Sequence, residues 1–178
     1  MVNPFACKIL HKKTSLAVLS DERNSALFTP LERAAIDEHI PWTRRVEERT
    51  TEAGGARVDL LPYIEEYRDS LVLKPSDEYG GKGIVLGWES TTEEWNTAMQ
   101  TALTEPYIVQ ERISLPTEPF PSFQGRGAVF EDRMLDTAPY CFSGEYVDGC
   151  LTRLATTSLL NVTSGGGSNV PTMLLEKR

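Results

Sequence analysis

The first part of the chain carries apolar residues at the three- and four-residue spacing of helices. This spacing predicts a helical apolar face over residues 4–20. Thr29 and Glu32 have the spacing of a capping box around a proline, which predicts a helix over residues 30–39. Pro41 is expected to end this helix, because proline disfavours helical backbone in the residue before it.

The segment that follows lacks a clear period. Residues 42–58 are polar and contain glycine, and they are expected to form a loop or a short mobile helix. Asp59 is expected to cap a helix over residues 60–68. The inward side chains of that helix are expected to be Leu61, Ile64 and Tyr67.

A strand, a polar glycine-containing turn and a second strand are predicted over residues 71–87. Residues 90–94 carry a second helix-start signal, so a helix is expected from there to about residue 103. The buried face of this helix is expected to hold Trp95, Met99 and Leu103. An apolar strand is expected over residues 107–113.

The last third of the chain begins with a proline-rich segment, residues 114–125, which is expected to be a loop. Alternating residues then predict strands near 126–132, 138–149 and 150–158, a turn at Gly149, a loop over 161–169 and a short final strand over 170–178. Helices therefore precede a mixed half with antiparallel strands. This order predicts the α+β class with two small lobes rather than one sandwich.

The expected domain organisation has three parts. Residues 1–70 form a helical segment, residues 71–113 a small α+β lobe, and residues 114–178 an antiparallel β lobe. The length allows one sizeable core or two small lobes, and the order of elements favours two lobes with a cleft between them.

Composition narrows the function classes. Hydrophobic residues make up 40% and charged residues 25% of the chain, which is ordinary for a globular protein. The net charge of −8 argues against a nucleic-acid partner, because an acidic surface repels a phosphate backbone. Three cysteines without a CxxC pattern and two histidines predict neither a disulfide framework nor a zinc site. No apolar run has the length of a membrane span or signal peptide, so we expect a cytoplasmic protein with no membrane partner.

The turn within residues 71–87 is the strongest candidate for chemistry. Gly80, Gly81 and Gly83 surround Lys82, and Lys74 ends the strand before them. Glycines let backbone N–H groups approach an anion closely, and lysines neutralise phosphate oxygens. The pattern predicts a phosphate-covering flap, with an ordinary tight hairpin as the alternative. It is not a Walker loop, because glycine rather than serine or threonine follows the lysine.

Three further places could carry chemistry. Gln110 and Glu111 lie near a strand end, where a carboxylate accepts from ribose hydroxyls or is simply solvated. Arg153 is either a surface residue or a planar donor aimed into a cleft. Asn161 could supply a neutral oxygen to a metal or belong to a flexible loop. Magnesium on a nucleotide needs one or two carboxylates. The spacing does not choose among Asp132, Asp136, Glu145 and Asp148.

Taken together, these segments resemble the ATP-grasp superfamily. More narrowly, they are similar to the bacterial circularly permuted ATP-grasp proteins related to glutathionylspermidine synthase. The resemblance rests on the ordered series PWTRRV, VLKPSDEYGGKG, IVQER and NVTSGGG, and it covers residues 3–174. It implies an ATP-grasp-like α+β fold in which two small lobes with antiparallel sheets enclose a nucleotide cleft. It also implies ATP and Mg²⁺ as cofactors, and small-molecule or peptide carboxylates and amines as substrates.

The resemblance assigns roles to individual positions. Lys74 and one of Lys12 or Lys13, with Lys13 as the candidate, would bind ATP phosphates. The flap would consist of Gly80, Gly81, Lys82 and Gly83, and the adenine and ribose pocket would be lined by Gln110, Glu111 and Ile113. Arg153 would contact the γ-phosphate and act in catalysis together with Lys74. Asn161 would help to hold magnesium, with Asp136 as the first choice among the acids.

The chain departs from the superfamily pattern at two positions. Leu159 stands where a Glu-x-Asn motif has glutamate, and Ala155 stands where an Arg-x-Asp motif has aspartate. The leading interpretation is a carboxylate–amine ligase domain that works through an acylphosphate and forms the C-terminal part of a longer enzyme. The departures favour an alternative, a non-catalytic nucleotide-binding or assembly module of the same fold. A glycine-rich domain without nucleotide is the third interpretation.

Overall fold

The protein is represented by a computed structural model that describes residues 4–125, 127–158 and 167–173. The chain divides into two units, Met1–Ile113 (unit 1) and Ser114–Arg178 (unit 2). Each unit has its own antiparallel sheet, so the expected mixed α+β class with antiparallel sheets is confirmed. No helix among the residues described here is long and apolar enough to cross a membrane.

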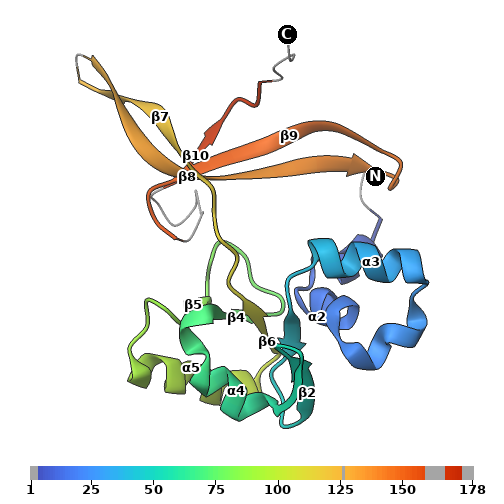
Figure 1. Cartoon of the computed structure of the whole chain (residues 1–178). Helices are drawn as coiled ribbons and strands as arrows, with labels where there is room; N and C mark the ends of the chain where they lie inside the picture. Colours follow the sequence, from blue (N-terminus) through green and yellow to red (C-terminus); the bar gives the residue numbers. More distant parts are fainter. Residues whose placement is uncertain (1–3, 126, 159–166, 174–178) are drawn as a thin grey trace. The chain divides into compact units, whose positions relative to one another are not determined.

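Unit 1 is built on a four-stranded sheet with the order β1-β6-β4-β5 (Figure 1). Its strands are β1 (Thr43–Arg45), β4 (Leu71–Pro75), β5 (Val85–Leu86) and β6 (Tyr107–Glu111). Strand β1 comes from residues 1–70, and the other three come from residues 71–113. The central strands β4 and β6 are almost fully buried, as their apolar runs predict.

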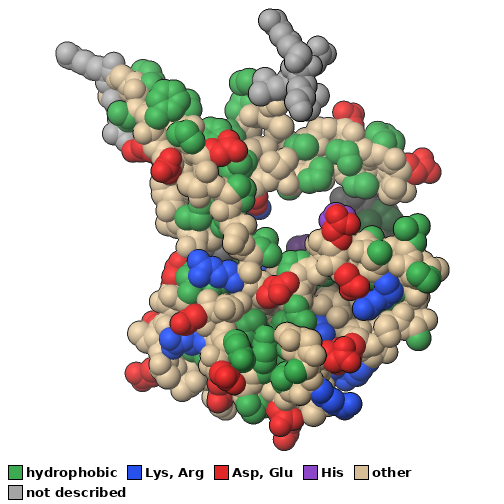
Figure 2. Space-filling model, in the orientation of Figure 1, with side chains coloured by type: hydrophobic (Ala, Val, Ile, Leu, Met, Phe, Trp, Pro, Cys, Tyr) green, Lys and Arg blue, Asp and Glu red, His purple; other side chains and the backbone are tan. Residues whose placement is uncertain are grey.

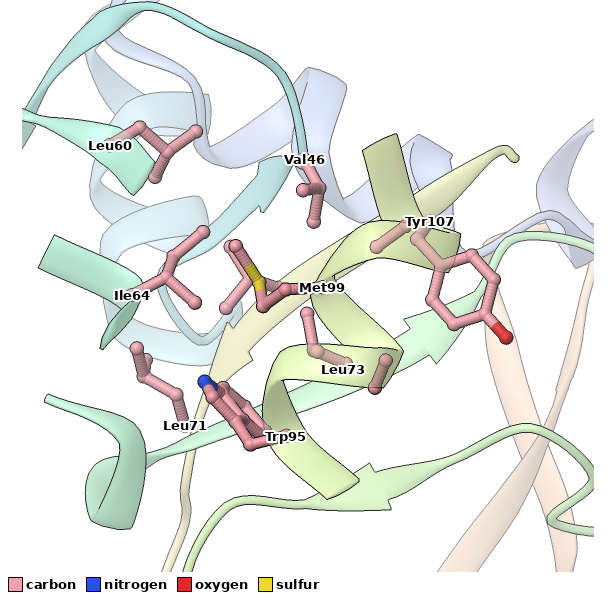
Figure 3. Close-up of a cluster of buried hydrophobic side chains, with 11 residues drawn as sticks. Val46, Leu60, Ile64, Leu71, Leu73, Trp95, Met99 and Tyr107 are labelled. Carbon is pink, nitrogen blue, oxygen red and sulfur yellow. The ribbon is translucent and has the colours of Figure 1, made fainter. Parts of the chain in front are cut away.

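Helices pack on both faces of this sheet. On one face, α4 (Leu60–Glu66) and α5 (Thr92–Thr104) enclose a core that includes Ile64, Leu73 and Trp95 (Figure 3). The other face meets α2 (Thr14–Ser20), which packs on β1 and β6. Two residues of that face, Ile108 and Gln110, are almost fully buried. The remaining helical elements are α1 (Cys7–His11), α3 (Pro30–His39) and the 3-10 turns η1 (Glu22–Leu27) and η2 (Arg68–Ser70).

Two helices begin at complete capping boxes. In α3 the Thr29 hydroxyl accepts from the backbone N–H of Glu32, and the Glu32 carboxylate accepts from the backbone N–H of Thr29. The start of α5 repeats this arrangement with Thr91 and Glu94. The expected helix over residues 30–39 is therefore confirmed. Its start depends on contacts within four residues, which the sequence carries by itself.

The helix expected over residues 60–68 is shorter in the structure. It ends at Glu66, and the side chain of Asp59 makes no capping hydrogen bond. Two apolar residues expected to face inward are largely exposed, Tyr67 by 46% and Leu103 by 43%. Tyr67 follows the end of α4, and Leu103 lies in the last turn of α5 (Thr92–Thr104).

The segment 42–58 is not a loop or a helix. It contains β1 and the hairpin of β2 (Thr50–Ala53) and β3 (Ala56–Asp59). Gly54 and Gly55 form the two-residue turn with φ of 57° and 79°. Two central residues with positive φ match the right-handed twist of paired strands, and glycine adopts this backbone without strain.

Unit 2 is a four-stranded antiparallel sheet with the order β10-β9-β8-β7. Its strands are β7 (Thr117–Gln124), β8 (Gly127–Phe142), β9 (Tyr146–Ala155) and β10 (Gly167–Val170). The loop expected over residues 114–125 was wrong, because most of it forms β7. Strand β7 lies at the sheet edge, where Pro119 and Pro121 can lack an N–H without breaking a ladder.

The turn between β8 and β9 lies four to six residues before the expected position. It includes Ser143 and Gly144, both with positive φ, whereas Gly149 lies within β9. Residues 171–173 do not form the expected final strand, and residues 174–178 lie outside the described part. Hydrophobic side chains are visible at the surface of this unit (Figure 2). Phe123 is 82% exposed and Phe130 is 72% exposed.

Candidate functional site

Strand β4 places Lys74 directly after its buried apolar run. Leu71, Val72 and Leu73 are buried, and Lys74 follows them as a half-buried residue. Its ammonium group donates a hydrogen bond to Gln110 Oε1 at 2.6 Å. Gln110 Nε2 in turn donates to Thr43 Oγ1 at 2.8 Å. A line of polar contacts therefore crosses β4, β6 and β1 on one face of the sheet.

Lys74 has an unusual electrostatic environment for a lysine. Burial lowers the pKa of Lys74 below its ordinary value, and the positive charge of Lys13 lowers it further. No described carboxylate forms an ion pair with Lys74. Burial also lowers the pKa of Lys13, although the nearby acids Asp77 and Glu78 oppose this effect. Two lysines far apart in the sequence thus lie close enough to repel each other, which favours an anion near both.

The glycine-rich turn has the backbone that its glycines permit. Gly80, Gly81 and Gly83 have φ values of 65°, 80° and 70°. A Cβ on Gly83 would lie 3.0 Å from the Tyr107 hydroxyl and 3.1 Å from Pro75 Cγ. The turn therefore rests on its own sheet at Gly83, and a side chain there would displace it.

Most of the lysines near the glycine-rich turn already form ion pairs with acidic residues of the β4–β5 hairpin. Asp77 pairs with Lys8 at 2.6 Å and with Lys12 at 2.8 Å. Glu78 pairs with Lys82 at 3.0 Å, and Lys82 is 76% exposed. The ammonium group of Lys13 donates instead to the backbone carbonyl of Glu78 at 2.6 Å. An anion bound here would compete with Asp77 and Glu78 for these cations.

The remaining candidates on β6 face different ways. Gln110 and Glu111 are consecutive strand residues, so their side chains lie on opposite faces of the sheet. Glu111 accepts a hydrogen bond from the backbone N–H of Trp42 at 2.7 Å. Ile113 lies just beyond the strand and is 58% exposed. The structure therefore brings Gln110, but not the side chain of Glu111, to the Lys74 face.

The late candidates belong to unit 2. Arg153 and Asp136 are direct cross-strand partners on β9 and β8. The guanidinium donates from both Nε and Nη2 to the two carboxylate oxygens. The hydrogen bonds to Asp136 raise the pKa of Arg153 despite its partial burial. Each charge is therefore neutralised by the other, and Asn161 lies outside the described residues.

A cluster of charged residues in unit 1 has no counterpart in the sequence expectations. Asp21 is 5% exposed and accepts hydrogen bonds from Arg23 and from Arg49, the closest at 2.5 Å. Arg44 is 2% exposed, and it donates to Glu22 at 2.8 Å. Arg44 is the first of the two arginines in the segment PWTRRV. This part of the motif series therefore helps to pack η1 on β1. No periodic signal in the sequence pairs residues 21–22 with residues 44–49.

Asp21 is expected to make unit 1 sensitive to acid. Burial by itself raises the pKa of Asp21 and is the largest single effect. The hydrogen bonds from Arg49 and Arg23 together outweigh it, so the pKa lies well below its ordinary value. As the pH falls through about 4, the unfolded chain binds a proton that the folded chain does not. The contribution of Asp21 to stability is therefore complete above this pH and is lost below it.

The check compares the wild type with Asp21→Asn in urea unfolding between about pH 5 and pH 3. As the pH is lowered, the free energy of unfolding should fall less steeply in the variant than in the wild type. The two slopes should differ by up to about 1.4 kcal/mol per pH unit. Tryptophan fluorescence reports on unit 1 alone, because all three tryptophans, Trp42, Trp88 and Trp95, lie there. Equal slopes for the two proteins would contradict the assignment.

Comparisons with known proteins give one partial similarity. No model of a known protein family matches this sequence. The chain is 31% identical over 113 residues to the Frankia casuarinae protein named "Putative glutamate--cysteine ligase 2-2". The matched segment is 60% of this chain and 13% of that protein. The chain therefore spans a small part of the length of this curated relative.

Proposed function

We propose that the chain is the ATP-binding part of a carboxylate–amine ligase of the ATP-grasp kind. Lys74 and Lys13 contact phosphate oxygens, and the glycine-rich turn with Lys82 covers them. The Gln110 side chain and the backbone of the strand end after it hold adenine and ribose. In the reaction, a carboxylate oxygen attacks the γ-phosphorus and ADP leaves. An amine nitrogen then attacks the acyl carbon, and phosphate leaves.

The observation that carries this proposal is the position of Lys74. Its ammonium group is half-buried, is held by the neutral Gln110 amide, and has Lys13 rather than a described carboxylate beside it. A structural lysine at a strand end commonly reaches solvent or an acid. Holding two cations together at partial burial is unfavourable without an anion, and a triphosphate supplies that anion. The similarity to a protein named as a glutamate–cysteine ligase supports the joining of a carboxylate to an amine.

The proposed magnesium ligands fit less well. Asp136 is tied to Arg153 through both carboxylate oxygens. Within the described ranges, no group of three or more His, Cys, Asp or Glu side chains could hold a metal ion. These residues do not form a magnesium site by themselves, so we derive no step through the metal.

This observation favours a second candidate function, a nucleotide-binding or assembly module without catalysis. The two candidates differ in their products rather than in nucleotide affinity. The ligase releases phosphate and ADP when it receives a suitable acid and amine together with ATP. The module binds ATP, releases neither product, and depends little on Mg²⁺. Titration of ATP with and without Mg²⁺, followed by a phosphate-release assay, separates them.

Saturating ATP is expected to stabilise unit 1 against heat. A ligand that binds only the folded state at one hundred times its Kd adds about 2.7 kcal/mol to the free energy of unfolding. The measurement is the unfolding midpoint followed by tryptophan fluorescence, at several ATP concentrations. Adenosine serves as the control, because it lacks the phosphates on which the lysines act. An unchanged midpoint at saturating ATP would refute both nucleotide-binding candidates.

A further inference from the structure

A cavity of about 320 Å³ that is open to solvent lies at the β1 edge of unit 1. Its walls come from α3, from Trp42 and Arg44, from the β2–β3 turn and from Glu111 at the end of β6. The volume is within the range of small-ligand sites. Strand β6 separates β1 from β4, the strand that carries Lys74.

Arg33 on α3 lines this cavity and has a hydrogen-bond donor that no described residue uses. Its side chain is 29% exposed, and its one ion pair joins Nη2 to Asp37 Oδ1 at 3.4 Å. Nη1 is buried and has no hydrogen-bond partner among the described residues. The other partly buried arginines that the structure describes each donate at least one hydrogen bond: Arg44, Arg49, Arg68, Arg133 and Arg153. A guanidinium in this state favours a ligand that offers carboxylate oxygens.

The second cation of the cavity is already used. Arg44 donates through Nε to Thr51 at 2.6 Å, and through Nη1 and Nη2 to Ser20 and Glu22 at 2.8 Å each. Its guanidinium also lies over the Trp42 ring, 4.9 Å from the ring centre. Arg44 therefore shapes the wall and leaves Arg33 as the group that can receive an anion.

Two acidic residues that line the same cavity have carboxylate oxygens without a hydrogen-bond partner among the described residues. Glu111 accepts one hydrogen bond, from the Trp42 N–H. The carboxylate of Glu52 has no partner in the part of the chain that the structure describes, and Glu52 also lines the cavity. Glu22, by contrast, is occupied by Arg44 and Arg49. The cavity thus combines one available cation with two available anions.

We propose that this cavity binds a small zwitterion, an α-amino acid or a short peptide with free termini. The ligand carboxylate contacts Arg33, and the ligand ammonium group contacts Glu52 and Glu111. Such a ligand carries both groups that a carboxylate–amine ligase joins. Its role as a substrate rests on the proposed function, whereas its binding does not require nucleotide.

The test is calorimetric titration with the amino acids and with glycyl-L-alanine at millimolar concentrations. The tightest-binding compound is then compared with its N-acetyl derivative and its carboxamide, which lack the ammonium group and the carboxylate. We expect each blocked derivative to bind at least about tenfold more weakly. Arg33→Gln should weaken binding of the free compound to the same extent. Arg45→Gln removes an exposed arginine outside the cavity and should leave it unchanged.

A further variant tests whether Glu52 binds the ammonium group of the ligand. Glu52→Gln should weaken binding of the free compound and should not alter binding of the N-acetyl derivative. Three results would overturn the proposal: no binding of any of these compounds, equal binding of the blocked derivatives, or equal binding by Arg33→Gln in a folded protein. ATP titration of Arg33→Gln keeps the two proposals separate. Failure of ATP binding in the wild type counts against the nucleotide site alone.

Discussion

The Lys74→Met variant is expected to bind ATP with a free energy weaker by about 2 kcal/mol or more, roughly a thirtyfold loss of affinity. Lys74 holds its charge at partial burial beside Lys13, which lowers the pKa of Lys74 in the free protein. A bound triphosphate offsets the repulsion between the two lysines, because it places negative charge beside both ammonium groups. Methionine keeps most of the length and the packing of the side chain, and it removes the charge together with the hydrogen bond to Gln110.

The same variant should leave the stability of the free protein almost unchanged. The loss of the hydrogen bond to Gln110 lowers the stability of the folded protein. The removal of a half-buried positive charge close to Lys13 raises it by a similar amount. We expect the free energy of unfolding to change by less than about 1 kcal/mol. A lysine that served only the fold would show the opposite pattern, with lost stability and unaltered ATP affinity.

Matched variants distinguish the two early lysines. Lys13→Met should weaken ATP binding, because Lys13 is the cation whose charge reaches Lys74. Lys12→Met should have little effect, since Lys12 is paired with Asp77 on the protein surface. Isothermal titration of ATP into each variant gives the affinities. Wild-type affinity in both Lys74→Met and Lys13→Met would remove the basis of the proposed phosphate site.

The Gly87→Ala variant is expected to lose about 4 kcal/mol or more of folding stability, or not to fold. Gly87 follows β5, is buried, and donates a backbone hydrogen bond to Leu71 O at 3.0 Å. A Cβ at this position would lie 1.9 Å from the backbone oxygen of Arg68 and 2.8 Å from that of Leu71. Both obstacles are backbone atoms, so no change of rotamer relieves the contact.

This loss has a direct consequence for the candidate site. Residues 68–71 lead into the strand that carries Lys74, so their displacement would move the β4–β5 hairpin as a whole. Urea unfolding followed by tryptophan fluorescence measures the effect in unit 1. Gly127→Ala is the control for the substitution in unit 2, where a Cβ meets no atom within 4 Å, and its unfolding is followed by circular dichroism. A loss below about 1 kcal/mol in Gly87→Ala would show that the close approach does not exist.

Short-range signals in the sequence determined several elements of this protein. The capping boxes at Thr29 and Thr91 predict the starts of α3 and α5, because all their contacts lie within four residues. The apolar runs 71–73 and 107–109 predict the two central strands for the same reason. The Gly54–Gly55 turn also has a local signal, because two adjacent glycines lie between two segments that can pair as strands. The hairpin was not predicted because the residues around the turn are mostly polar.

The candidate site is only partly contained in the sequence. The pattern of lysine and glycine over residues 74–83 marks a place where an anion could bind. It does not show that Lys13, about sixty positions earlier, lies beside Lys74, or that Gln110 holds the ammonium group. It also does not show that Arg153 is bound to Asp136 across two strands. These pairings depend on which strands become neighbours and in which register.

What the sequence determined by itself is therefore the type and position of elements whose signals are local: the capped helices, the apolar strands and the glycine-rich turn. Only the tertiary structure decided which charges meet. It placed Lys13 next to Lys74, gave Asp21 its two arginines, and left Nη1 of Arg33 without a hydrogen-bond partner among the described residues. The physical reason is that Coulomb energies and hydrogen bonds depend on distance in space and on burial, neither of which is encoded by spacing along the chain.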